Sequence, residues 1–406
     1  MVYLDHNATT RPTVGVVEAA TRAMVDGWGN PSSVHRFGQE AKHSIEVARG
    51  QAAKLLGVKG GGRGIVFTGS GSEAIGLGIG GTLHAMKATG KRVVVTSSVE
   101  HSAVRGTCTQ MVSDGEIELR TVGVDGDGVI DFEALRDAVD ESVGLLSIQW
   151  VNNETGVVQD VGAIGELCRE RGAVFHCDAT QWVGKMETCL EGGVEGGDPS
   201  AGSLIDVLTC SPHKFHGVKG VGILWARSDS ARRVRMVAMV PGSQELGRRG
   251  GTEGVPAIVG AGVAAMEAAE WLSLGDEDRA RLSGMRDRLE GAIVERCSAL
   301  IGERVVVNGG NARRMWNVTN LGFPGLGGEA LLLAMSERGL CASGGAACAS
   351  GSLEASEVLL AMGVDERVGR GSVRLSLSRE TTEAEIDEGI EIACKAVEVV
   401  GRSMVR

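Results

Sequence analysis

The chain has 406 residues, of which 43% are hydrophobic and 23% charged, a composition typical of a globular protein too long for one small core. Its formal net charge of −11 and its lack of a long basic stripe disfavour direct nucleic-acid binding. No apolar run reaches about 18 residues, and the first residues lack the pattern of a signal peptide, so we expect a cytoplasmic protein with no membrane association. Its nine cysteines form no CxxC pairs, which argues against a disulfide framework and a structural zinc site.

Two helices are predicted near the start of the chain, after a short polar segment. Residues 4–10 carry Asp, His, Asn and Thr side chains, which are typical of turns. We expect a helix over 12–26, with its proline near the first turn, and a longer helix over 35–56. The Asn-Pro-Ser-Ser segment at 30–33 is typical of a helix cap.

A strand followed by small residues comes next. Residues 63–68 are predicted as a strand, and Gly69-Ser70-Gly71-Ser72 opens a helix directly after it. Small residues at such a junction let backbone N–H groups and the helix dipole approach a phosphate. Many strand-to-helix turns look the same, so the motif alone is a weak indication.

Three further strands are each followed by polar residues. The strand at 93–96 leads to His101, which also stands where a helix cap belongs. The strand at 144–150 leads to Asn153, and the strand at 173–177 leads to Asp178. Open α/β sheets bind ligands at the carboxyl ends of their strands, so these side chains are candidates for one site.

One lysine follows the strand that ends at residue 209, in Ser211-Pro212-His213-Lys214. Buried lysines are rare, and a buried amine with a lowered pKa is suited to forming a Schiff base. Ser211 and His213 offer donors for an anion such as phosphate. An acid at one strand end and a lysine at a later one suit pyridoxal phosphate, whose ring nitrogen would meet Asp178 and whose aldehyde would meet Lys214.

The C-terminal part alternates helices and strands. A long helical region is predicted from 255 to about 297, and we expect shorter elements at 305–307, 317–321, 329–338, 340–342, 372–377 and 382–400. Arg374 lies on one of these strands and needs an anion, either a bound carboxylate or an ordinary salt-bridge partner. Cys348 lies in ten small residues at 343–352, a pattern typical either of a flexible loop carrying a thiol or of a buried loop base.

These motifs, in this order, resemble the cysteine desulfurases, which are pyridoxal-phosphate enzymes of the aspartate-aminotransferase fold type. The likeness extends from Tyr3-Leu4-Asp5-His6-Asn7 to Arg374-Leu375-Ser376, through Asp178-Ala179-Thr180-Gln181, Ser211-x-His213-Lys214 and Ser343–Cys348. It implies an α/β fold with a mostly parallel seven-stranded sheet. We place a large domain at 15–258 and a small domain in 1–14 and 259–406.

The resemblance implies that L-cysteine is converted to L-alanine while its sulfur moves to Cys348 as a persulfide and then to an acceptor such as an iron–sulfur scaffold. It implies catalytic roles for Lys214, Cys348 and His101, and substrate contacts for Asn7, Asn153 and Arg374. It implies no resident metal, and leaves open a transient ligation of an iron–sulfur cluster by Cys348. The implied cofactor contacts are Gly71, Ser72, His101, Asn153, Asp178, Gln181, Ser211, His213, Lys214 and Thr252.

Thr252 would reach the phosphate of the other subunit, so the resemblance also implies a homodimer. The Gly- and acid-rich stretch at 187–203 is predicted to be a surface insertion. Two alternatives stay open. One is a selenocysteine lyase or related aminotransferase that uses Lys214 without Cys348. The other is a non-catalytic scaffold, supported only by departures from the family pattern at Gly76, Trp182, Leu246 and Gly254.

Overall fold

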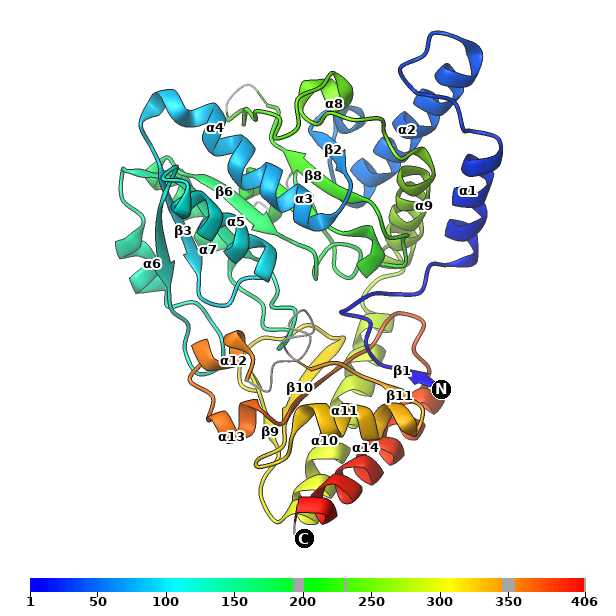
Figure 1. Cartoon of the computed structure of the whole chain (residues 1–406), viewed down its shortest axis with the longest axis vertical. Helices are drawn as coiled ribbons and strands as arrows, with labels where there is room; N and C mark the ends of the chain where they lie inside the picture. Colours follow the sequence, from blue (N-terminus) through cyan, green and yellow to red (C-terminus); the bar gives the residue numbers. More distant parts are fainter. Residues whose placement is uncertain (193–200, 230–231, 345–354, 405–406) are drawn as a thin grey trace.

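The structure is a computed structural model that describes residues 1–192, 201–229, 232–344 and 355–404. Figure 1 shows a larger body built around one sheet and a smaller body below it, where both ends of the chain lie. The first strand lies in the smaller body, and the chain then crosses to the larger one. This crossing places the polar residues 4–10 between the two bodies.

The larger body is an α/β structure with a seven-stranded sheet, as predicted. Its strand β8 is antiparallel to both neighbours, and its other strand pairs are parallel. The β5 strand is buried at every position, as expected for a parallel strand covered on both faces by helices. The order across the sheet is β2 (Ile65–Thr68), β8 (Gly222–Ala226), β7 (Val207–Cys210), β6 (Val174–Asp178), β5 (Val143–Gln149), β3 (Val93–Ser97) and β4 (Glu118–Val122).

Most helices of the larger body begin at a side chain that caps them. The Thr13 hydroxyl accepts from the backbone of the first turn of α1, and the His35 ring does the same for α2, so both predicted helices are confirmed. The helices are α1 (Val14–Val25), α2 (Arg36–Leu55), α3 (Gly71–Gly76), α4 (Thr82–Met86), α5 (Ser102–Ser113), α6 (Phe132–Ala138), α7 (Val161–Arg171) and α8 (Gln244–Gly247), with a π-helical turn at Leu77–Gly81 between α3 and α4.

The predicted helical region after residue 255 consists of two helices. The first, α9 (Val255–Leu272), packs against α1 and α2, and the second, α10 (Glu277–Ile301), follows a turn at Gly275. The domain boundary predicted at residue 258 falls inside α9, and the division into domains stays a prediction. Among the described helices, α9 alone is long and apolar enough to span a membrane, and half of it is buried within the protein, as in a core helix.

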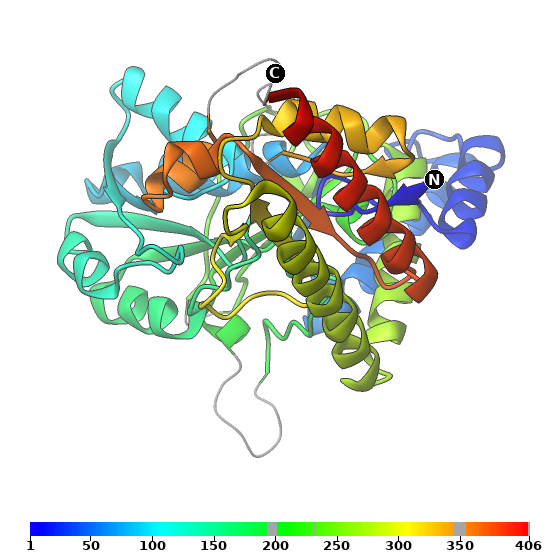
Figure 2. The ribbon, with the colours of Figure 1, turned by 90° about the horizontal axis from the view of Figure 1, so that it is seen from below.

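The smaller body contains an antiparallel sheet of β9 (Val306–Val307), β10 (Val318–Gly322) and β12 (Ser372–Ser376). Figure 2 shows α10 and α14 (Glu383–Met404) side by side on it, and the two helices are in contact. The strand β1 (Val2–Tyr3) pairs in parallel with β11 (Leu340–Cys341). The remaining helices are α11 (Gly328–Glu337), α12 (Glu357–Ala361) and α13 (Glu366–Gly369).

Candidate functional site

A cavity of about 1010 Å³ lies where the carboxyl ends of the sheet strands face the smaller body. Asp178 is the last residue of β6, and Ser211 directly follows β7, so strand direction alone brings them to the same edge. The cavity lining includes all but two of the predicted site residues: Asn7, Gly71, Ser72, His101, Asn153, Asp178, Gln181, Ser211, His213, Lys214 and Arg374.

The two remaining predicted residues are Thr252 and Cys348. Thr252 is exposed and lines a separate surface hollow together with Trp28 and Pro31. Cys348 lies outside the described residues, and so does the central part of the predicted insertion at 187–203.

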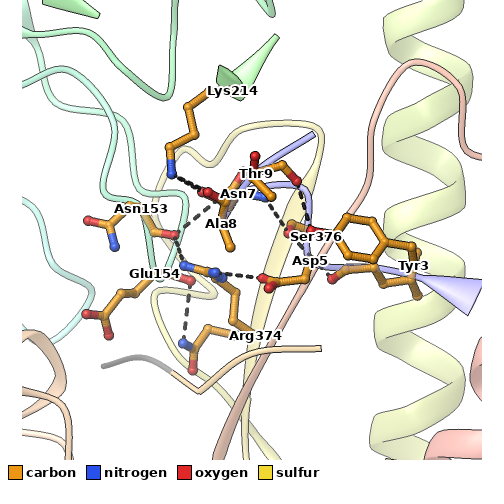
Figure 3. A network of polar contacts seen from close by, with 12 residues as sticks. Tyr3, Asp5, Asn7, Ala8, Thr9, Asn153, Glu154, Lys214, Arg374 and Ser376 are labelled. Atoms are coloured by element: carbon orange, nitrogen blue, oxygen red, sulfur yellow. Dashed lines mark hydrogen bonds and ion pairs between the residues drawn. The ribbon is translucent and has the colours of Figure 1, made fainter. Parts of the chain in front are cut away.

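The N-terminal segment brings backbone oxygens to the lysine. The Nζ of Lys214 donates to the carbonyl oxygens of Asn7 at 2.7 Å and Ala8 at 2.8 Å (Figure 3). Asn7 is itself held by two hydrogen bonds. Its side-chain Nδ2 donates to Asn153 O at 3.2 Å, and its backbone N–H donates to Ser376 Oγ at 2.9 Å. The Lys214 amine is thus held by the N-terminal segment, which is held in turn by residues from the middle and from the C-terminal part of the chain.

Arg374 is buried and spans the same junction. One of its terminal nitrogens pairs with Asp5 Oδ1 at 2.8 Å, and the other donates to Asn153 O at 3.0 Å (Figure 3). The salt bridge that the sequence left as an alternative is thus present. The Arg374 Nε is buried and has no hydrogen-bond partner among the described residues. A guanidinium has five N–H groups and these two bonds use two of them, so further donors remain for another acceptor.

His101 both caps a helix and lines the cavity. Its Nδ1 accepts from the Ala103 N–H at 3.1 Å, which places it at the start of α5. A neutral imidazole with an acceptor Nδ1 carries its proton on Nε2. Burial lowers the pKa of His101, and the charge of Asp178 opposes that shift. The two alternatives for His101 are therefore compatible, because its second nitrogen is left for the cavity.

The start of α3 closely approaches the segment that carries the lysine. A Cβ on Gly71 would lie only 2.0 Å from Ser211 Oγ, so a larger residue at position 71 would displace this hydroxyl. The His213 Nδ1 lies 3.1 Å from Thr9 Oγ1, and burial together with the Lys214 charge lowers the pKa of His213 to about 4. A neutral imidazole, a serine hydroxyl and a glycine backbone thus meet on one side of the cavity.

These groups fit pyridoxal phosphate. The buried Asp178 carboxylate suits a protonated ring nitrogen, and the Lys214 amine suits an aldehyde, both within one cavity. The cradle at Gly71 and Ser211 provides the small residues and donors that a phosphate needs. The donor set and the close backbone approach both match the cofactor.

Three buried ionisable residues near the cavity were not predicted from the sequence. Lys185 is held between Asn7 and Gln181, and Glu154 Oε2 accepts from Ser356 Oγ at 2.5 Å. Burial raises the pKa of Glu154 to about 7 and that of Glu100 to about 8. In the sequence each of these three is an ionisable residue beside an apolar run, and this pattern by itself does not identify the partner of the side chain.

Two of the departures from the family pattern can be placed. Trp182 stacks on Trp150 with ring centroids 4.2 Å apart and an interplanar angle of 5°, and it does not line the cavity. Leu246 is 81% exposed in a left-handed conformation. Nothing in the structure explains Gly76 or Gly254, since a Cβ at either would make no close contact.

Comparison with known proteins identifies the family. The sequence profile of the class-V aminotransferases matches residues 2–388. A protein named cysteine desulfurase 2, from Trichormus variabilis, is 41% identical over 399 residues, covering 98% of this chain and 93% of that protein.

Solved structures agree with this result. A NifS-like protein superposes with a TM-score of 0.83 at 32% identity, covering 98% of each chain. A structure titled SspA in complex with cysteine has a TM-score of 0.77 at 30% identity, covering 94% of this chain and all of that one. The chain therefore belongs to the cysteine desulfurase family of pyridoxal-phosphate-dependent class-V aminotransferases.

Proposed function

We propose that this protein is a cysteine desulfurase, which converts L-cysteine to L-alanine and passes the sulfur to Cys348 as a persulfide. The observation that carries the proposal is a single cavity in which Lys214, Asp178, His101 and Arg374 meet, in a chain whose relatives are cysteine desulfurases. The neighbour solved with cysteine supports the choice of substrate.

The bound cofactor would be held along the whole cavity. When bound, pyridoxal phosphate supplies an electron sink for negative charge at the substrate Cα. Lys214 would hold the aldehyde carbon, and Asp178 would keep the ring nitrogen protonated. Asn153, Gln181 and His101 would contact the ring, and Gly71, Ser72, Ser211 and His213 would contact the phosphate. The partner subunit's Thr252 would add a further contact to the phosphate.

The residues of this chain then bind the substrate and move its protons. Arg374 lines the cavity and binds the carboxylate through its guanidinium group, with Asn7 and Asn153 beside it. Lys214 takes the proton from the substrate Cα, and the N–H at Nε2 lets His101 assist proton transfer at the substrate carbons.

Sulfur transfer is assigned to Cys348. Its thiolate attacks the substrate sulfur, the bond between that sulfur and Cβ breaks, and the electron pair stays on Cβ, which takes up a proton to give alanine. The products are alanine and a persulfide on Cys348. A persulfide needs a thiol or metal-bound acceptor, and we propose an iron–sulfur scaffold protein in the cytoplasm.

A homodimer is supported by an apolar surface that we call the α1–α2 surface, formed by Met24, Trp28 and Phe37. These side chains are exposed, and Trp28 stacks on Phe37 with ring centroids 5.3 Å apart. Thr252 shares a hollow with Trp28 on this surface. Thr252 does not line the cavity of its own chain. Its place beside an exposed apolar patch fits a dimer in which the partner subunit docks on this patch and uses Thr252 in its own cavity.

The first test is alanine and sulfide release from L-cysteine with a thiol reductant present. Cys348→Ala is expected to abolish release while keeping the absorbance of the bound cofactor. Cys341→Ala, which removes a part-buried thiol in β11, is the matched control and should stay active. Equal activity of Cys348→Ala and wild type, or turnover of selenocysteine alone, would instead make the protein a lyase that does not use Cys348.

A further inference from the structure

A buried lysine, Lys185, lies behind one wall of the cavity without lining it. Its side chain is 5% exposed, and its Nζ donates to Gln181 Oε1 at 2.6 Å and to Asn7 Oδ1 at 2.9 Å. Both of these amides do line the cavity. Burying a lysine is costly. Because Lys185 is buried beside the site with two neutral amides as its partners, we expect it to have a function there.

Hydrogen-bond chemistry decides which way the Gln181 amide faces. A lysine ammonium has three donors and no acceptor, so Lys185 must hold the oxygen of the amide. The NH2 group of Gln181 then faces the other way, where it donates to the Asn7 carbonyl oxygen at 3.1 Å. That same carbonyl accepts from Lys214 Nζ at 2.7 Å. The Gln181 NH2 group is thus placed beside the lysine assigned to the cofactor.

The Asn7 amide depends less on Lys185. Its Oδ1 accepts a second bond from Asn317 Nδ2 at 3.0 Å, and its own Nδ2 donates to Asn153 O. For Gln181 Oε1, Lys185 is the one hydrogen-bond donor among the residues that the structure describes. Loss of the lysine amine therefore leaves Gln181 Oε1 without its donor, so that the Asn7 carbonyl alone orients the Gln181 amide, while Asn7 keeps its other contacts.

The two bonds do not depend on the charge of the amine. Burial lowers the pKa of Lys185 well below its ordinary value, and the nearby charge of Lys214 lowers it further. A neutral amine still has two N–H groups, one for each oxygen that it holds.

We propose that Lys185 is a positioning residue, which holds Gln181 with its NH2 group toward the cavity as a donor to an acceptor oxygen of the bound cofactor. This inference rests on the proposed function, because that function places Gln181 at the cofactor ring. It adds a role for a side chain that lines no part of the cavity.

A double-mutant cycle with pyridoxal phosphate as the probe tests this role without turnover. The full chain is stripped of cofactor and titrated as wild type, Lys185→Met, Gln181→Leu and the double variant, with Kd taken from the absorbance of bound cofactor. Each single change is expected to raise Kd about tenfold, as for one lost hydrogen bond. Because both changes remove the same hydrogen bond to the cofactor, the Kd of the double variant is also expected to be about tenfold above wild type. Losses that multiply to about a hundredfold, or a wild-type Kd in Lys185→Met, overturn the proposal.

Lys185→Gln is the conservative control. It keeps an N–H donor for Gln181 Oε1 and removes the charge, so its Kd should stay within about twofold of wild type. If Lys185→Met does not fold, the cycle is run with Lys185→Leu, which also removes the donor, and losses that multiply to about a hundredfold overturn the proposal.

The outcomes also separate the two proposals. A wild-type chain that takes up no pyridoxal phosphate overturns both. A chain that binds the cofactor with the expected cycle, and whose Cys348→Ala variant still transfers sulfur, overturns only the proposed function.

Discussion

Glu100 shows how burial sets the state of a single residue at this site. Its side chain is fully buried next to His101, with Ser97 Oγ 2.5 Å from one carboxyl oxygen and the Gln149 N–H donating to the other at 2.9 Å. Burial is the largest cause of its raised pKa, about 8, and the charge of Asp178 adds to it. Glu100 is therefore protonated in the folded protein at neutral pH.

The raised pKa of Glu100 predicts a pH-dependent cost to stability. An unfolded Glu titrates near ~4.3, so between that pH and about 8 the folded state binds the extra proton and stability falls as pH rises. Glu100→Gln imitates the neutral acid and removes this dependence. We expect its free energy of unfolding, measured by urea titration, to rise relative to that of wild type between pH 5 and 8, by at most ~1.4 kcal/mol per pH unit. A constant difference between the two proteins across this range would contradict the prediction.

Arg374 carries a second prediction at the same scale. Arg374→Lys keeps a positive charge for Asp5 but removes the planar guanidinium fork that lines the cavity and is proposed to bind the substrate carboxylate. We expect KM for L-cysteine to rise about tenfold or more, as for one lost charge-assisted bond, with little change in cofactor absorbance. Steady-state kinetics measures the change, and an unaltered KM would remove Arg374 from substrate binding.

At the scale of elements, one buried ion pair anchors the segment around α8. Arg49 on α2 pairs through two nitrogens with Glu245, at 2.8 and 2.9 Å, and Glu245 also accepts from the Phe67 N–H in β2. Glu245 and Leu246 both have positive φ angles, which non-glycine residues rarely adopt. The three contacts hold this strained turn in place, and Thr252 follows it closely in the chain.

Breaking this anchor should loosen the turn. Arg49→Met leaves the Glu245 carboxylate buried without its partner, which is expected to cost about 3–5 kcal/mol of stability. Hydrogen exchange should rise first in residues 241–252. The double variant Arg49→Met with Glu245→Gln is the control, because it removes the uncompensated charge and should recover part of the loss. Equal exchange in Arg49→Met and wild type would show that the pair does not anchor this segment.

At the scale of the whole molecule, the α1–α2 surface and the position of Thr252 lead to a prediction about assembly. Trp28→Asp places a charge on this surface, where Trp28 is 67% exposed, and should convert a dimer to monomers in sedimentation velocity. Because Thr252 would come from the partner, monomers should also bind the cofactor more weakly. Leu300→Asp, which changes a half-exposed residue at the end of α10, is the matched control and should stay dimeric.

A further comparison separates assembly from cofactor contact. Thr252→Ala should remain dimeric while its Kd for pyridoxal phosphate rises several-fold to about tenfold, since one donor to the phosphate is lost. A cofactor Kd unchanged in both Trp28→Asp and Thr252→Ala would mean that each cavity is complete within one chain.

The sequence by itself determined most strands of the large sheet, the helices α1 and α2, and the edge of the sheet where the site lies, but it did not predict β4. These follow from local chemistry: apolar β-branched runs form buried strands, and polar residues directly after parallel strands collect at one edge. For this reason Asp178, Asn153 and Lys214 could be placed at one site before any contact was known. The α/β fold and its mostly parallel sheet were confirmed for the same reason.

Only the tertiary structure decided which distant side chains pair. Trp182 packs on Trp150, Arg374 meets Asp5 across 369 positions, and Lys185 holds the amides of Asn7 and Gln181. Such pairs leave no periodic signal, because contacts between distant segments depend on how the two bodies meet and not on local spacing. The carbonyl oxygens around Lys214 and the Lys185 donor to Gln181 depend on how the two bodies pack together, because residues 4–10 lie between the bodies in the folded protein.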